Sequence, residues 1–178
     1  MLLKDDDEKR YLELQEQALD DAREGESESL KKMLEHGLPV NLANSKGNTL
    51  LMLAAYHDHP TTVQLLLDYG AEVDRPNDRG QTPLAGVAFK GFVEVAKLLL
   101  DSGANPLTPQ GNTGTTMGIE MTPLRFAMLF GRKEIQKLFE EHLALPQSQK
   151  FSFLLRMASF FRKWFLGTRI EIKEKNKA

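Results

Sequence analysis

Cysteine is absent from the 178 residues of this sequence. Without thiols the chain has neither a disulfide framework nor a zinc site built on thiolates, and nothing in its composition requires an oxidising compartment. Hydrophobic residues make up 41% of the sequence and charged residues 27%, which is ordinary for a soluble globular domain. We therefore expect one folded domain in the cytoplasm.

A secretory signal is also missing from the N-terminus. Such a signal begins with basic residues that precede an apolar run, whereas here Met1–Lys4 leads directly into four acidic residues, Asp5–Glu8. We expect no cleaved targeting segment, and we interpret residues 1–12 as an acidic lead to the folded part.

No group of residues in the sequence is typical of an active site. There is no Gly-x-Ser-x-Gly nucleophile turn, and the acidic stretches at 5–8 and 24–28 are solvated charge runs rather than a pair facing across a pocket. His57 and His59 flank an aspartate, but neighbouring side chains on a helix point about 100° apart and do not converge on one ion. We interpret His59 as a structural residue, and we predict that the protein is not an enzyme and has no cofactor or metal.

A short motif that recurs after 33 residues is the strongest structural signal in the sequence. Gly47–Leu51 matches Gly80–Leu84 in this way, and Gly37, Gly70 and Gly103 follow the same period. A fixed period of this length indicates a repeat array, in which each unit buries its apolar face only by stacking on its neighbours.

The residues of the repeated motif indicate a protein family. A period of about 33 residues with a Thr-Pro-Leu phrase is typical of ankyrin repeats, and the chain carries this phrase at Thr82–Leu84 and Thr122–Leu124. Over residues 14–142 the chain resembles the ankyrin-repeat family. The sequence of its two central repeats is similar to that of small stand-alone members in bacteria and fungi. The resemblance implies an all-α solenoid of about four helix-turn-helix units with hairpin-like fingers, at about 13–43, 44–76, 77–107 and 108–142.

The sequence departs from the family pattern in three places. The first unit has polar residues at apolar positions, including Asp21 and Lys32, which favours a capping repeat. The histidine of the usual phrase is replaced by Met52, Ala85 and Arg125, so we expect weaker coupling between units. The step from Thr82 to Thr122 is 40 residues rather than 33, which predicts a long finger near residues 109–118; this stretch is rich in glycine but lacks the Gly-Lys-Ser/Thr of a phosphate-binding loop.

The resemblance also implies where a partner protein binds, because ankyrin arrays usually contact other proteins through the finger tips and a concave face. The implied positions on the concave face are Tyr56, His57, Phe89, Lys90, Leu129 and Phe130. Those at the finger tips are Ser45, Lys46, Asn48, Asp78, Arg79 and Gln81. Large rings at exposed positions favour an interface, since they bury much area at a small entropic cost. Alternatively, the rings pack on one another, or the C-terminal segment folds back over them.

The C-terminal segment, residues 143–178, has a charge opposite to that of the array. Residues 150–178 hold eight lysines and arginines against two acids, a net charge of +6, which leaves −8 for residues 1–149. Near Phe151–Leu166 the polar residues recur every three to four positions, which predicts an amphipathic helix. The residues of this helix that we expect to bind or cap are Phe153, Arg156, Phe160, Phe161, Trp164 and Phe165.

Three interpretations of this helix remain open. It caps the last repeat, it lies on an anionic membrane surface through residues 150–166, or it binds a partner. From the sequence we predict a monomeric protein-interaction module that binds no nucleic acid, since the array is acidic and the tail has no motif of a nucleic-acid reader. The alternative is a secreted bacterial effector whose C-terminal helix docks on a membrane or a partner inside a host cell.

Overall fold

Paired helices form the part of the chain that the computed structural model describes, residues 5–111 and 121–144. The helices are α1 (Asp5–Glu24), α2 (Ser27–Glu35), α3 (Leu50–Tyr56), α4 (Pro60–Asp68), α5 (Pro83–Lys90), α6 (Val93–Asp101), α7 (Pro123–Leu129) and α8 (Lys133–His142). No strand occurs among these residues, although an isolated antiparallel bridge joins Ala43 and Thr49. The prediction of an all-α array of helix pairs is confirmed.

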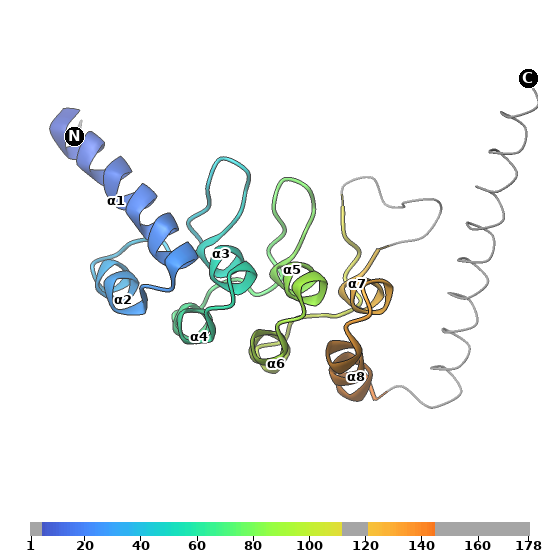
Figure 1. Ribbon diagram of the computed structural model, residues 1–178. Helices are drawn as coiled ribbons and strands as arrows, with labels where there is room; N and C mark the ends of the chain where they lie inside the picture. The colour runs from blue at the N-terminus through green and yellow to red at the C-terminus, as the bar shows by residue number, and fades with distance from the viewer. Residues whose placement is uncertain (1–4, 112–120, 145–178) are drawn as a thin grey trace, which may run out of the picture. The chain divides into compact units, whose positions relative to one another are not determined.

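The helices stack in two rows within residues 1–139, the first of two compact units into which the chain divides. The first helices of successive pairs pack on one another, α1 on α3, α3 on α5 and α5 on α7, and α4 packs on both α2 and α6. In Figure 1 the fingers project upward from the row that contains α3, α5 and α7, while α2, α4 and α6 lie below it. The second unit, residues 140–178, begins inside α8.

Threonine begins the first helix of each of the last three pairs. The hydroxyls of Thr49, Thr82 and Thr122 accept a hydrogen bond from the backbone N–H three residues later, at 3.1, 3.4 and 3.3 Å. Proline follows Thr82 and Thr122 at the first helical position, where an N–H would have no partner within the helix. The repeated phrase is therefore the start signal of a short helix.

The first helix differs from the sequence prediction in its length and in one buried side chain. It begins at Asp5, so it continues through the boundary at residue 12 that separates the predicted acidic lead from the array. Asp21, expected as a polar residue of a cap, is 8% exposed. Its position between Ala18 and Ala22 places it on the packed face of the helix, and its Oδ2 atom has no hydrogen-bond partner.

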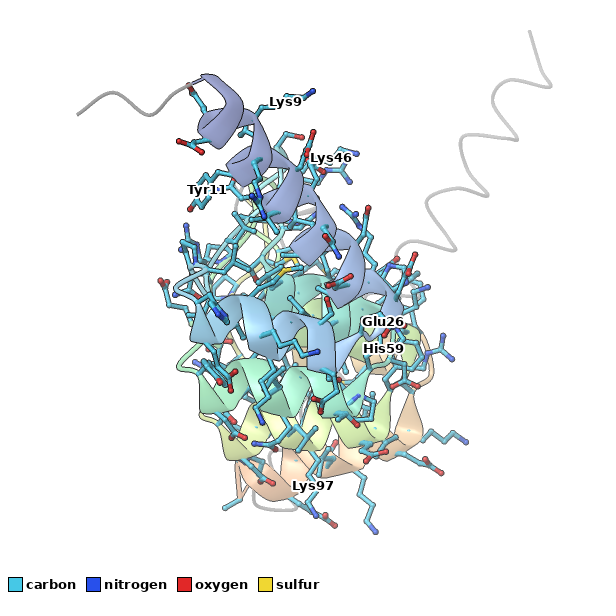
Figure 2. All side chains as sticks on the ribbon, turned by 90° about the vertical axis from the view of Figure 1, so that its left-hand side faces the viewer. Lys9, Tyr11, Glu26, Lys46, His59 and Lys97 are labelled. Atoms are coloured by element: carbon cyan, nitrogen blue, oxygen red, sulfur yellow. The ribbon has the colours of Figure 1, made fainter. Side chains whose placement is uncertain are left out.

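Side chains of the second and fourth repeats cap the first helix of the preceding repeat. His59 Nε2 lies 2.7 Å from the carbonyl oxygen of Arg23, and Arg132 Nε donates to the carbonyl oxygen of Phe89 at 3.0 Å. Figure 2 shows His59 beside the end of α1. Because the last carbonyls of a helix lack partners within the helix, these contacts join neighbouring repeats. The interpretation of His59 as a structural residue agrees with this contact.

A second periodic contact joins the repeats through Asn41 and Asp74. Asn41 Oδ1 accepts a hydrogen bond from the Glu72 N–H at 2.9 Å, and Asp74 Oδ2 accepts one from the Asn105 N–H at 2.9 Å. Asp74 Oδ1, however, is buried without a partner. Burial raises the pKa of Asp74 above its ordinary value of 3.8, and the hydrogen bond from Asn105 only partly opposes this effect.

We expect Asp74→Asn to raise the melting temperature slightly at neutral pH. An acid with a raised native pKa holds its proton more tightly in the folded state, so its contribution to stability is lost as pH rises from 3.8 through the native pKa. Asparagine keeps the acceptor for the Asn105 N–H and carries no charge, as Asn41 already does in the preceding repeat. Thermal unfolding at pH 7 and at pH 3.5 measures the effect, with the exposed Asp101→Asn as the charge-matched control.

A gain for Asp74→Asn at pH 7 that disappears at pH 3.5 would support this account of the buried carboxylate. An equal gain for Asp101→Asn would assign the effect to net charge instead.

Candidate functional site: a groove between the fingers and the first helices

The fingers are built by asparagine side chains that hold their turns closed. Asn44 Oδ1 accepts hydrogen bonds from the N–H groups of Lys46 and Asn48, at 3.0 and 3.1 Å. Asn77 Oδ1 does the same for Arg79 and Gln81, at 3.0 Å each. Such bonds mimic a backbone turn. The tips are therefore fixed in conformation by the sequence of each finger.

Neighbouring fingers are bonded to each other as well. The Asp78 N–H donates to the Lys46 carbonyl at 3.1 Å, and Asn77 Nδ2 donates to Asn48 Oδ1 at 2.8 Å. Gly47, with φ of +72°, lies so close to the second finger that an added Cβ would stand 2.5 Å from Asp78 Oδ1. The first two fingers consequently form one continuous wall.

The third finger contains the insertion that the sequence predicts. Its base is closed by a hydrogen bond of 2.7 Å from the Gln110 N–H to the Met121 carbonyl, equivalent to the Asn44–Asn48 and Asn77–Gln81 bonds of the shorter fingers. Gln110 replaces asparagine at this position, and its longer side chain accepts from the Thr82 N–H at 2.8 Å. Residues 112–120 lie outside the described residues.

A groove of about 550 Å³ lies between the fingers and the first helices. Its floor is apolar and belongs to α3, α5 and α7, and its rim is polar and belongs to the fingers. The floor residues are Met52, Leu53, Tyr56, Ala85, Gly86, Phe89, Phe126 and Phe130. The rim residues are Lys46, Asn48, Asn77, Asp78, Arg79, Gln81 and Thr82.

The aromatic rings of the floor contact one another and remain partly open. Phe89 and Phe130 meet edge to face with ring centres 4.6 Å apart, and Phe126 stacks on Phe130 at 6.2 Å. Tyr56, Phe89 and Phe130 are nevertheless 40%, 39% and 44% exposed. The predicted alternative, in which the rings pack on one another, therefore describes part of the arrangement. Within the first unit, the exposed parts of these rings still form an apolar surface.

One cation lies over the Tyr56 ring at the end of α3. The ammonium group of Lys90 lies 4.5 Å from the centre of the Tyr56 ring, and the His57 ring meets the same tyrosine edge to face. Burial, and then the charges of His59, Lys90 and Arg23, lower the pKa of His57 below its ordinary value of 6.5. His57 is therefore neutral near pH 7, and the positive charge beside Tyr56 comes from Lys90.

The groove contains some of the predicted binding residues and not others. Eight of them line it: Tyr56, Phe89, Phe130, Lys46, Asn48, Asp78, Arg79 and Gln81. Ser45, His57, Lys90 and Leu129 are exposed but do not line it. Of the predicted pair at the end of α7, Phe130, the residue that follows the helix, lines the groove and Leu129 does not.

Five floor residues were not among the predicted binding positions: Met52, Leu53, Ala85, Gly86 and Phe126. Each lies three or four residues before Tyr56, Phe89 or Phe130, which places it on the same side of its helix. A Cβ at Gly86 would stand 3.1 Å from Tyr56 Cδ2, so a larger residue there would require the Tyr56 ring to shift by a few tenths of an ångström. Helical periodicity applied to the predicted row would have identified these positions.

The predicted helix near residues 151–166, with Phe153, Arg156, Phe160, Phe161, Trp164 and Phe165, lies outside the described residues. Its three interpretations stay predictions. Among residues 5–111 and 121–144, no helix has the length and apolar character needed to cross a bilayer. In the same ranges no three histidine, cysteine or carboxylate side chains are grouped as a metal site would require.

Comparison with known proteins agrees with the repeat geometry. The model of the family described as ankyrin repeats, in three copies, matches residues 19–110. A segment of 49 residues is 55% identical to a protein of Pseudomonas aeruginosa whose name describes it as an ankyrin repeat protein. This match covers 28% of the present chain and 29% of the relative, so the chain aligns with less than a third of the relative's length.

Proposed function

Because the chain belongs to the ankyrin-repeat family, we propose that it is a recognition module without enzymatic activity, whose groove binds one partner protein. Ankyrin repeats generally mediate interactions between proteins. The observation that supports the groove as the binding surface is its combination of partly exposed rings on the floor with a fixed polar rim. We take the module to act as a monomer, as the sequence predicts.

The arrangement of the groove suits protein recognition for two physical reasons. Aromatic rings bury a large apolar area on binding and lose few rotatable bonds, so they dominate the energy of many interfaces. The hydrogen bonds within and between the first two fingers hold the rim in place before a partner arrives. Binding then costs little further ordering of the rim.

The triple variant Tyr56→Ala, Phe89→Ala and Phe130→Ala is expected to weaken partner binding at least tenfold, about 1.4 kcal/mol or more. The experiment captures partners from a lysate with the full chain and with the variant, and then measures the affinity of each recovered protein. Tyr69→Ala is the matched control, because Tyr69 is 38% exposed and does not line the groove.

Circular dichroism checks that the triple variant remains helical. If the folded triple variant retains every partner with unchanged affinity, the groove is not the binding surface and this proposal is wrong.

A further inference from the structure

The rim of the groove carries two cations that have no partner in the described part of the chain. Lys46 and Arg79 are exposed at the tips of the first two fingers. The ion pairs Lys9–Glu13, Arg23–Asp20 and Arg75–Glu72 do not involve Lys46 or Arg79. Asp78 is the one acid among the residues that line the groove.

This local charge contrasts with the charge of the surrounding molecule. Residues 1–149 have a net charge of −8, and α1 with α2 contribute eleven acidic residues against five basic ones. The groove lining instead has two basic residues and one acidic residue, and Lys90 adds a third cation over the Tyr56 ring. Positive charge is therefore concentrated where the apolar floor is open.

From this charge pattern, and building on the proposed function, we infer that the groove binds an acidic segment of the partner protein that carries large apolar side chains. The apolar side chains would lie on the rings of α3, α5 and α7, and the acidic groups would face Lys46 and Arg79. Complementary charge at a rim speeds association and excludes partners of the wrong sign. The excess of acidic residues in α1 and α2 further disfavours the binding of acidic segments to these two helices.

Two other occupants fit the observations less well. Single-stranded nucleic acid also stacks on aromatic side chains, but it needs a groove that tracks its phosphates with positive charge, and here Asp78 interrupts the rim. The chain's own residues 150–166 hold four basic residues and no acidic one, so they carry the same sign as the rim. An acidic protein segment satisfies both the floor and the rim.

A peptide selection tests the inference. A phage-displayed library of random peptides is selected on the full chain, on the double variant Lys46→Glu and Arg79→Glu, and on the double variant Lys31→Glu and Lys97→Glu. The last variant is the matched control: it makes the same change of charge on α2 and α6, and Lys97 lies on the side of the array opposite to Lys46 (Figure 2).

We expect the full chain and the control to enrich peptides rich in glutamate, aspartate and aromatic residues. The rim variant should lose the preference for acidic residues. Synthetic copies of the enriched peptides should bind the rim variant at least tenfold more weakly than the full chain, and their affinity should fall as salt is raised.

The selection separates failure of this inference from failure of the proposed function. If enriched peptides show no acidic preference but fail to bind the Tyr56, Phe89 and Phe130 alanine variant, the groove binds proteins and the inferred chemistry is wrong. If the full chain enriches no peptide, or if the peptides bind the alanine variant equally well, both proposals are wrong.

Two further measurements would also overturn the inference. One is saturable binding of an oligothymidine to the full chain that the rim variant loses, which would assign the groove to nucleic acid. The other is light scattering that shows an oligomer of the full chain which the rim variant dissociates, since this would assign the groove to a second copy.

Discussion

Replacing Leu84 by alanine is expected to lower the free energy of unfolding by about 2 to 5 kcal/mol. Leu84 has no exposed surface, and its helix α5 packs against α3, α6 and α7. Removal of its methyl groups leaves a cavity that these helices cannot fill without moving together. In a repeat array the loss also weakens the contacts that the third repeat makes with both neighbours.

Urea unfolding followed by circular dichroism measures the loss at Leu84. Leu107→Ala is the matched control, because Leu107 is 46% exposed and its replacement should change stability by less than about 0.5 kcal/mol. Equal losses at the two leucines would contradict the packing described for α5. Since α5 also carries Gly86 and Phe89 of the groove, the Leu84 variant should lose partner binding at a lower temperature than the full chain.

The second large effect is expected for Gly25→Ala, at about 2 to 4 kcal/mol, from backbone strain together with the loss of a hydrogen bond. Gly25 has φ of +84°, and a Cβ there would stand 2.5 Å from His59 Nδ1. The imidazole would have to leave its contact with the Arg23 carbonyl. Gly37, with φ of +92° and open space around it, should show only the backbone strain, about 1 to 2 kcal/mol.

A double-mutant cycle separates the two contributions at Gly25. In a His59→Ala background the clash is absent, so Gly25→Ala should cost about as much as Gly37→Ala. The chain already contains a related pair: Asp58, with φ of +63°, occupies the corresponding position in the second repeat, and there Phe92 replaces the capping histidine. Equal costs for Gly25→Ala and Gly37→Ala in the original background would show that His59 does not impose glycine.

The binding residues that could be predicted from the sequence are those that recur at equivalent positions of successive repeats. Tyr56, Phe89 and Phe130 were identified because a period places them at equivalent ends of successive helices. Gly86 and Phe126 were not identified, because the prediction followed the period between repeats and did not extend it to residues three or four positions earlier on the same helix. Whether exposed rings leave open space also depends on distances between helices, which no single repeat encodes.

The sequence by itself determined the repeat, the fold and the places where helices begin, because these follow from local signals: a 33-residue period, threonine caps and turn asparagines. The tertiary structure decided which side chains meet across repeats. It buried Asp21 on the packed face of α1, set His59 against the Arg23 carbonyl, and brought finger and helix residues into one groove. Such contacts join residues about 30 positions apart, and their geometry depends on how neighbouring repeats stack rather than on the sequence of either repeat alone.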